Sequence, residues 1–156
     1  MEDVVRAFGF LTLGTRMKRI GERLQADTQQ IMDELDAPLQ ASQYPFLAAL
    51  DRLGPLSIGE IAEAVGITQP GATRSVAQLV ADRFCEVQKA PADQRRKIIS
   101  LTKKGQQIVA HGKHQVWPRL EAAVAELCGG LSGPLLEQLA AIEDGLKAKP
   151  LIRRGR

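Results

Sequence analysis

Residues 56–82, LSIGEIAEAVGITQPGATRSVAQLVAD, restrict the fold of this chain more than any other segment. Ser57 and Glu60 have the spacing of a capping box, in which each side chain satisfies a free backbone donor at the start of a helix. Gly66 can adopt the left-handed conformation that ends this helix, and Thr68 can cap the next one, which runs to the end of the segment. The spacing therefore predicts two short helices joined by a tight turn, a helix-turn-helix.

The second of these helices, over 68–82, has one polar face. Val76, Leu79 and Val80 form its apolar face, and Ile67 in the preceding turn is expected to point inward. The side chains expected to face outward are those of Gln69, Thr73, Arg74 and Gln78. Such a face serves solubility in any surface helix, but Arg can also donate twice to guanine and Gln can pair with adenine.

Two residues near the start of this helix bear on how it would meet DNA. A helix N-terminus binds phosphate well, so Thr68 is a candidate phosphate contact. Gly71 costs a helix about 1 kcal/mol relative to alanine. Close approach of the helix to DNA would explain this glycine, and so would the tolerance of a first helical turn.

A β-hairpin follows the helix-turn-helix. The runs FCEVQKA and RKIISLT favour strands, and PADQ between them favours a turn. Residues 64–104 contain eight bases and three acids, a net charge of +5, whereas the whole chain carries only +3, which leaves −2 for the rest. A helix-turn-helix with a basic hairpin is a winged helix, and its local positive charge favours a polyanion-binding surface.

Long helices are expected on both sides of this lobe, and the fold class is mainly α. The apolar periodicity predicts one helix over 6–35 that ends at Asp36-Ala37-Pro38, and a second over 42–53 with Ser42 as its cap. Thr102 is expected to cap a helix over 103–127 that Pro118 kinks, and a last helix is expected over 132–147.

The run DQRRKIISLTKKG, Asp93 to Gly105, resembles the wing of MarR-type transcriptional regulators, and residues 56–84 resemble the helix-turn-helix of that family. The resemblance implies a homodimer in which N- and C-terminal helices form the dimerisation platform. The implied regions are an N-terminal dimerisation helix region (1–41), a DNA-binding lobe (42–102), and C-terminal dimerisation helices with a basic tail (103–156).

The resemblance also implies roles in the wing. Arg95 would enter the minor groove of DNA, whose negative potential attracts arginine, while Asp93 would brace the wing through an ion pair. Arg96 and Lys97 are better placed for phosphates, which position a protein without specifying sequence.

Many members of the family respond to small anionic, aromatic or phenolic effectors. Tyr44, Phe46, Arg16 and Trp117 could line a cleft for such an effector, although core packing or surface charge explains each of them as well. Other sets of residues give no cofactor or metal signal. Cys85 and Cys128 are interpreted as small buried hydrophobes, and His111 and His114 as solvated, with no third strong ligand near them.

These observations predict a dimeric, sequence-specific double-stranded DNA-binding regulator, most simply a repressor released by an effector. Its pseudo-palindromic operator would have half-sites about one helical turn, ~34 Å, apart. No catalytic set is evident, so an enzyme is not expected. The alternative is a winged-helix protein-interaction module without specific DNA binding, which would not need a basic wing. No apolar run reaches the ~18 residues of a membrane span, and a cytoplasmic location is expected.

Overall fold

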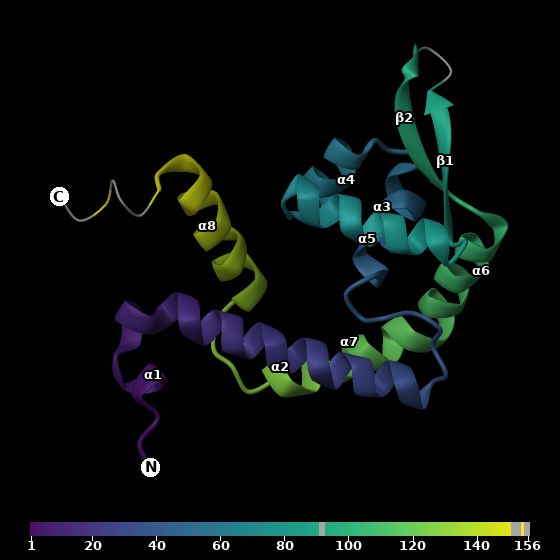
Figure 1. The fold of residues 1–156 in the computed structure, drawn as a ribbon. Helices are drawn as coiled ribbons and strands as arrows, with labels where there is room; N and C mark the ends of the chain where they lie inside the picture. Colours follow the sequence, from purple (N-terminus) through teal and green to yellow (C-terminus); the bar gives the residue numbers. More distant parts are fainter. Residues whose placement is uncertain (91–92, 151–153, 155–156) are drawn as a thin grey trace. The chain divides into compact units, whose positions relative to one another are not determined.

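The computed structural model describes residues 1–90, 93–150 and 154, and the side chains of residues 90 and 93–96 are not described. The chain forms two compact units, residues 1–120 and 121–156. The helices (Figure 1) are α1 (Val4–Ala7), α2 (Leu13–Glu34), α3 (Tyr44–Leu53), α4 (Ile58–Val65), α5 (Gln69–Ala81), α6 (Lys103–His111), α7 (Trp117–Cys128) and α8 (Leu135–Ala148). The two strands are β1 (Cys85–Ala90) and β2 (Asp93–Leu101).

The N-terminal segment is not the single helix expected over 6–35. Gly9 has a positive φ of 54°, and a 3₁₀ turn over Gly9–Thr12 separates α1 from α2. Thr12 stabilises this break, because its hydroxyl donates to the carbonyl oxygen of Val5 at 2.6 Å. The apolar periodicity did not predict this break, because a glycine within the pattern leaves the spacing of the apolar residues unchanged.

The core of the first unit lies under the helix-turn-helix and the wing. Its fully buried side chains include Met32, Leu47, Ile61, Leu79, Val109 and Val116, which come from α2 through the segment after α6. Tyr44 and Phe46 are buried among them, so both pack in the core. The apolar faces of α4 and α5 meet here, which fixes the outward direction of the polar face of α5.

The wing is an antiparallel pair joined to the start of the helix-turn-helix. Cys85 pairs with Leu101 at its base and Lys89 with Lys97 farther out, beyond which the register shifts. Leu56 adds a short bridge at Ile99: each of these two residues donates its N–H to the other's carbonyl, at 3.0 and 2.7 Å. This bridge ties the base of the wing to the residues that precede α4, so wing and helix-turn-helix form one body.

The helix after the wing departs from α geometry before its proline. Thr102 caps α6 as predicted: its hydroxyl oxygen accepts a hydrogen bond from the backbone N–H of Gly105 at 3.0 Å. A π-helical turn over Gly112–Val116 then leads into α7, where Pro118 is the second residue. Proline lacks the N–H that continues an α-helix, so an irregularity in the turn before it has a direct cause.

Two local predictions were wrong. Ser42 does not cap α3, which begins after Gln43 without a side-chain cap bond. Ile67 does not point fully inward, since 39% of it is exposed. Both residues lie in short connections, where neighbouring elements rather than local pattern decide orientation.

Candidate nucleic-acid interface

The helix-turn-helix is built by local hydrogen bonds at each helix end. In the capping box of α4, the backbone N–H of Ser57 donates to the carboxylate of Glu60 at 2.8 Å, and the Glu60 N–H donates back to the Ser57 hydroxyl. Gly66 ends α4 with φ of 73°. Thr68 then caps α5, accepting from the N–H of Gly71 at 3.4 Å. These contacts confirm the predicted helix-turn-helix.

The first two turns of α5 present polar side chains to solvent. Gln69, Thr73 and Arg74 are exposed, whereas Ala72 and Val76 on the other side of the helix are buried. The hydroxyl of Thr73 donates to the carbonyl of Gln69 at 2.9 Å. Its hydrogen is therefore used within the helix, and Thr73 offers outward a methyl group and an acceptor oxygen.

Gln78 is exposed but is engaged with its own helix. Its amide nitrogen lies 3.1 Å from both carboxylate oxygens of Asp82, one turn farther along. The sequence pattern placed Gln78 in one outward-facing set with Gln69, Thr73 and Arg74. Its bond to Asp82 distinguishes it from the other three. The signal for this bond was present in the sequence as a Gln–Asp pair at i,i+4 spacing.

Gly71 has a reason that does not involve DNA. A Cβ at this position would lie 3.2 Å from the Thr68 hydroxyl oxygen, which is the atom that caps α5. That separation is tighter than ordinary contact, so a side chain here would press on the cap. A side chain at position 71 would therefore require the Thr68 hydroxyl to shift by a few tenths of an ångström.

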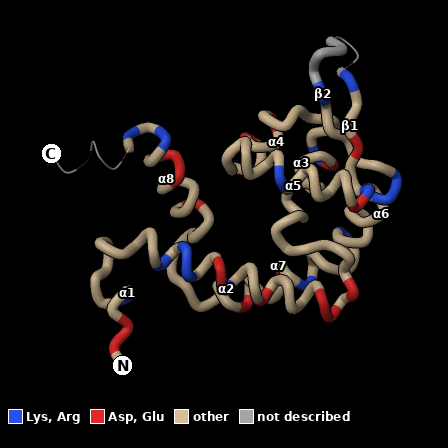
Figure 2. Tube along the Cα trace, in the orientation of Figure 1, with Lys and Arg blue, Asp and Glu red and all other residues tan. Residues whose placement is uncertain are grey.

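The wing carries several basic residues, and the structure describes the side chains of some of them. Lys97 is exposed opposite Lys89 on the paired strands. The backbone of Asp93, Arg95 and Arg96 belongs to β2, but their side chains lie outside the described part of the chain, and the ion pair expected between Asp93 and Arg95 lies there too. Figure 2 shows bases along the wing and at the start of α6.

A further basic group lies where α5, β1 and α6 meet, and its members were expected only as part of the basic segment 64–104. The ammonium of Lys104 donates to the carbonyl of Asp82 at 3.0 Å and lies 4.3 Å from the ring centre of Phe84. Arg83 and Lys103 beside it are exposed. The sequence showed only that these residues belong to the basic segment. The fold brings residues 83 and 103 together.

The described residues give no sign of a metal site or of a reactive thiol at Cys85. Within the described part of the chain, no three His, Cys, Asp or Glu side chains are grouped so as to hold a metal ion. Burial raises the pKa of the Cys85 thiol to about 12, which keeps it in the unreactive protonated form near neutral pH. Among the described helices, none is both long and apolar enough to cross a membrane.

The arrangement of two helices, a tight turn and an antiparallel hairpin defines a winged helix-turn-helix, a class of DNA-binding fold. The sequence model of the MarR family matches residues 37–96. The matched segment contains both helices of the helix-turn-helix and part of the wing, so this part of the chain is similar to MarR-family regulators.

Solved structures agree with this assignment. The chain is similar to a Mycobacterium tuberculosis transcriptional regulator, MosR, in complex with DNA (TM-score 0.72, 20% identity, 89% of this chain and 98% of that one). It is also similar to a mutant MarR of Escherichia coli complexed with operator DNA (TM-score 0.70, 20% identity, 94% and 98% covered). These two likenesses show the fold.

A third similar structure is more alike in sequence. BpsR of Bordetella bronchiseptica, whose DNA binding is regulated by 6-hydroxynicotinic acid, shares 28% identity with a TM-score of 0.67 (87% of this chain and 91% of that one). No curated protein sequence matches this chain.

Proposed function

We propose that this chain is a homodimeric repressor that binds a pseudo-palindromic operator in double-stranded DNA and is released by a small-molecule effector. The observation that carries the proposal is the exposed group Gln69, Thr73 and Arg74 on the first two turns of α5. Recognition helices of this class contact base edges with their N-terminal residues. The DNA-bound structures of similar fold support the same use of α5.

The roles within the interface follow from side-chain chemistry. Arg74 reads base edges, because its guanidinium can donate twice to one guanine. Thr73 contributes apolar contact to a thymine methyl, since its hydroxyl hydrogen is used by Gln69. Thr68, Arg96 and Lys97 contact phosphates, and Arg95 with Asp93 serves the minor groove. Gln78 can contact bases only when its hydrogen bond to the Asp82 carboxylate is broken.

Dimerisation is proposed from apolar side chains that each unit leaves exposed. In the first unit, Phe10 is 93% exposed and Leu11 is also exposed; in the second, Leu127 and Leu136 are exposed. Large apolar side chains that are exposed together mark interaction sites, and Phe10 and Leu11 are neighbours of this kind. A second copy of the chain would bury these side chains and would place two reading heads at the spacing of two half-sites.

The dimer is tested by sedimentation of the full chain with one charged substitution in each region. Leu11→Glu and Leu136→Glu should shift the protein toward monomer at micromolar concentration while its helical circular dichroism is retained. Leu53→Glu is the matched control, because Leu53 is an exposed leucine at the end of α3. A wild-type chain that sediments as a folded monomer would contradict the dimer.

The regulator itself is tested by selecting DNA from a random pool with the purified protein. We expect an inverted repeat with half-site centres about one helical turn apart. Binding to random DNA should be weaker and should fall steeply with salt, because it rests on phosphate contacts. Salt-independent binding, or no selected sequence, would favour the protein-interaction module.

Repression and effector release need a separate measurement. A reporter placed behind the selected operator should be silenced by the protein. The known regulation of BpsR by 6-hydroxynicotinic acid supports a small aromatic acid as one effector to try here. Activation of the reporter by the bound protein would contradict the repressor role.

A further inference from the structure

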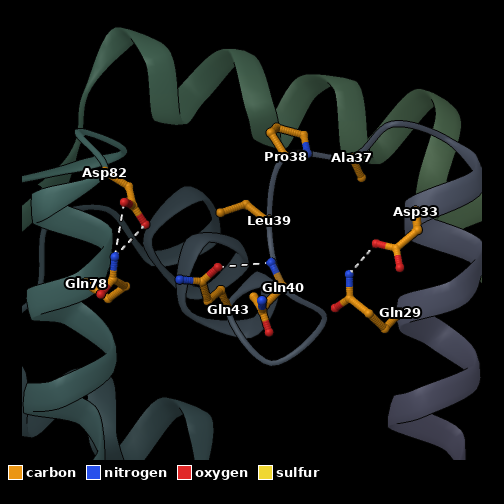
Figure 3. A pocket seen from close by; sticks show the side chains of 9 residues that line it. All are labelled: Gln29, Asp33, Ala37, Pro38, Leu39, Gln40, Gln43, Gln78 and Asp82. Atoms are coloured by element: carbon orange, nitrogen blue, oxygen red, sulfur yellow. Dashed lines mark hydrogen bonds between the residues drawn. The ribbon is translucent and has the colours of Figure 1, made fainter.

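A pocket of about 540 Å³ lies between the end of α2, residues 37–43 and the end of α5 (Figure 3). All of its lining residues belong to the first compact unit. Leu39 is buried at its base, and the remaining walls are mainly polar. The pocket therefore touches the same helix that carries the candidate base-reading residues.

Two walls of the pocket repeat one arrangement. On α2, the amide of Gln29 donates to the carboxylate of Asp33 at 2.8 Å, and on α5 the amide of Gln78 donates to that of Asp82 at 3.1 Å. Each pair has i,i+4 spacing on its helix. In Figure 3 the two pairs stand on opposite sides of the pocket, with Leu39 between them.

The amides hold these carboxylates in place. Gln29 is itself fixed, because its side-chain oxygen accepts from the backbone N–H of Ala41 at 2.8 Å. A carboxylate that accepts one amide hydrogen still has acceptor capacity for other donors. Two held carboxylates thus face one space from two different helices.

The charge of the lining decides what the pocket can accept. It includes Asp33 and Asp82 but no lysine or arginine. The ammonium of Lys104, which is not part of the lining, donates to the backbone carbonyl of Asp82 at 3.0 Å. An anionic ligand would meet two negative charges and no positive charge within the lining, whereas a ligand with positively charged N–H donors would complement both carboxylates.

We propose that this pocket binds a small organic cation with N–H donors at both ends, a diamine or an amine-guanidine, held between Asp33 and Asp82. Such a ligand links α2 to the last turn of α5. It also competes with Gln78 for the Asp82 carboxylate, and thereby changes how α5 is held. This coupling to DNA rests on the proposed function, but the binding site does not.

The site is tested by calorimetric titration of the full chain without DNA. The probes are 1,5-diaminopentane and glutarate, which have five carbons each and opposite charge, at one fixed ionic strength. We expect the diamine to bind once per chain and glutarate not to bind. Asp33→Asn and Asp82→Asn should each weaken diamine binding by about tenfold, because each removes one charge-assisted contact.

Asp27→Asn is the matched control. Asp27 is a carboxylate of the same helix that pairs with Arg23 outside the pocket, so its loss should leave diamine affinity unchanged. Equal or tighter binding of glutarate would overturn the proposal. So would diamine binding that survives in the Asp33→Asn/Asp82→Asn double variant, since the cation would then bind elsewhere.

The coupling is tested on the selected operator. The diamine should change operator affinity in the wild type but not in the double variant, and this comparison removes any direct effect of the diamine on DNA. Calorimetric binding without any operator binding would count against the proposed function and leave the pocket standing. Operator binding by a chain that ignores the diamine in both experiments would overturn the pocket.

Discussion

The Cα of Gly105 on α6 lies directly against the backbone carbonyl of Phe84. A Cβ at position 105 would overlap that carbonyl oxygen, which cannot move without displacing the start of β1. Thr102 strengthens the same junction, because its hydroxyl donates to the carbonyl of Arg83 at 2.7 Å and its N–H donates to that of Phe84 at 3.1 Å. The Leu-Thr-x-x-Gly sequence after the wing therefore joins three elements: α5, β1 and α6.

Gly105→Ala should destabilise the protein by about 1–3 kcal/mol or more, since a methyl group is forced into occupied space. The measurement is urea unfolding followed by circular dichroism. Gly59→Ala is the control, because Gly59 is also in the first turn of a helix and has no atom within 4 Å of its Cβ position. The control should be neutral or gain up to ~1 kcal/mol. Equal stability of the two variants would contradict the close contact at Gly105.

Arg83→Gly should raise stability by a few tenths to about 1 kcal/mol. Arg83 has φ of 62°, where L side chains are strained by roughly 1–2 kcal/mol and glycine is not. Part of this gain is offset by the greater freedom of glycine in the unfolded chain. Thermal unfolding measures the change. Arg83→Ala keeps the strain and serves as the control, so an equal gain in both variants would refute the explanation.

Arg74→Ala should cost about 1–3 kcal/mol at the selected operator and relax base preference at one position in each half-site. Lys97→Ala should weaken all DNA sequences alike and reduce the salt slope by roughly one unit. Fluorescence anisotropy at several salt concentrations separates the two effects. Discrimination between operator and random DNA that is unchanged in Arg74→Ala would show that α5 does not read bases through this residue.

Asp93 and Arg95 should act as a unit in the wing, as the family resemblance implies. If Asp93 braces Arg95, then Asp93→Ala weakens operator binding, and the double variant is little worse than Arg95→Ala alone. The four affinities are compared at one salt concentration. Tighter binding on removal of Asp93 in both backgrounds would mean that this acid only repels phosphate.

Stability should fall as the pH rises from about 9 toward 12, in part because of Cys85. Burial raises the pKa of this thiol from 9.0 to about 12 in the folded protein, so the unfolded chain releases the proton first. The contribution of Cys85 is complete below pH 9 and is lost through this window. Burial also raises the pKa of Tyr44, which acts in the same direction.

Urea unfolding at pH 8 and pH 10.5 tests this, with Cys85→Ala as the comparison. The loss of stability between the two pH values should be smaller in Cys85→Ala than in the wild type. At pH 8 the folded protein should react with a thiol reagent at half-buried Cys128 and not at buried Cys85. Rapid labelling of Cys85 in the folded state would contradict its burial.

The sequence by itself determined the ends of α4 and the starts of α5 and α6. Ser57 with Glu60, Gly66, Thr68 and Thr102 act through hydrogen bonds or backbone angles within a few residues, so their spacing is sufficient to place them. The hairpin and its basic character followed from composition in the same way. Local chemistry therefore predicted the winged helix, and the family resemblance agreed with it.

Only the tertiary structure decided which side chains meet across the fold. Gly9 could continue a helix or break it, and the positive φ of 54° that breaks it is seen only in the structure. The i,i+4 spacing of Gln78 and Asp82 predicts that they pair. Their position across the pocket from Gln29 and Asp33 depends instead on how the ends of α2 and α5 pack. Such juxtapositions join residues about fifty positions apart, and no local periodicity records them, because they result from the packing of whole elements.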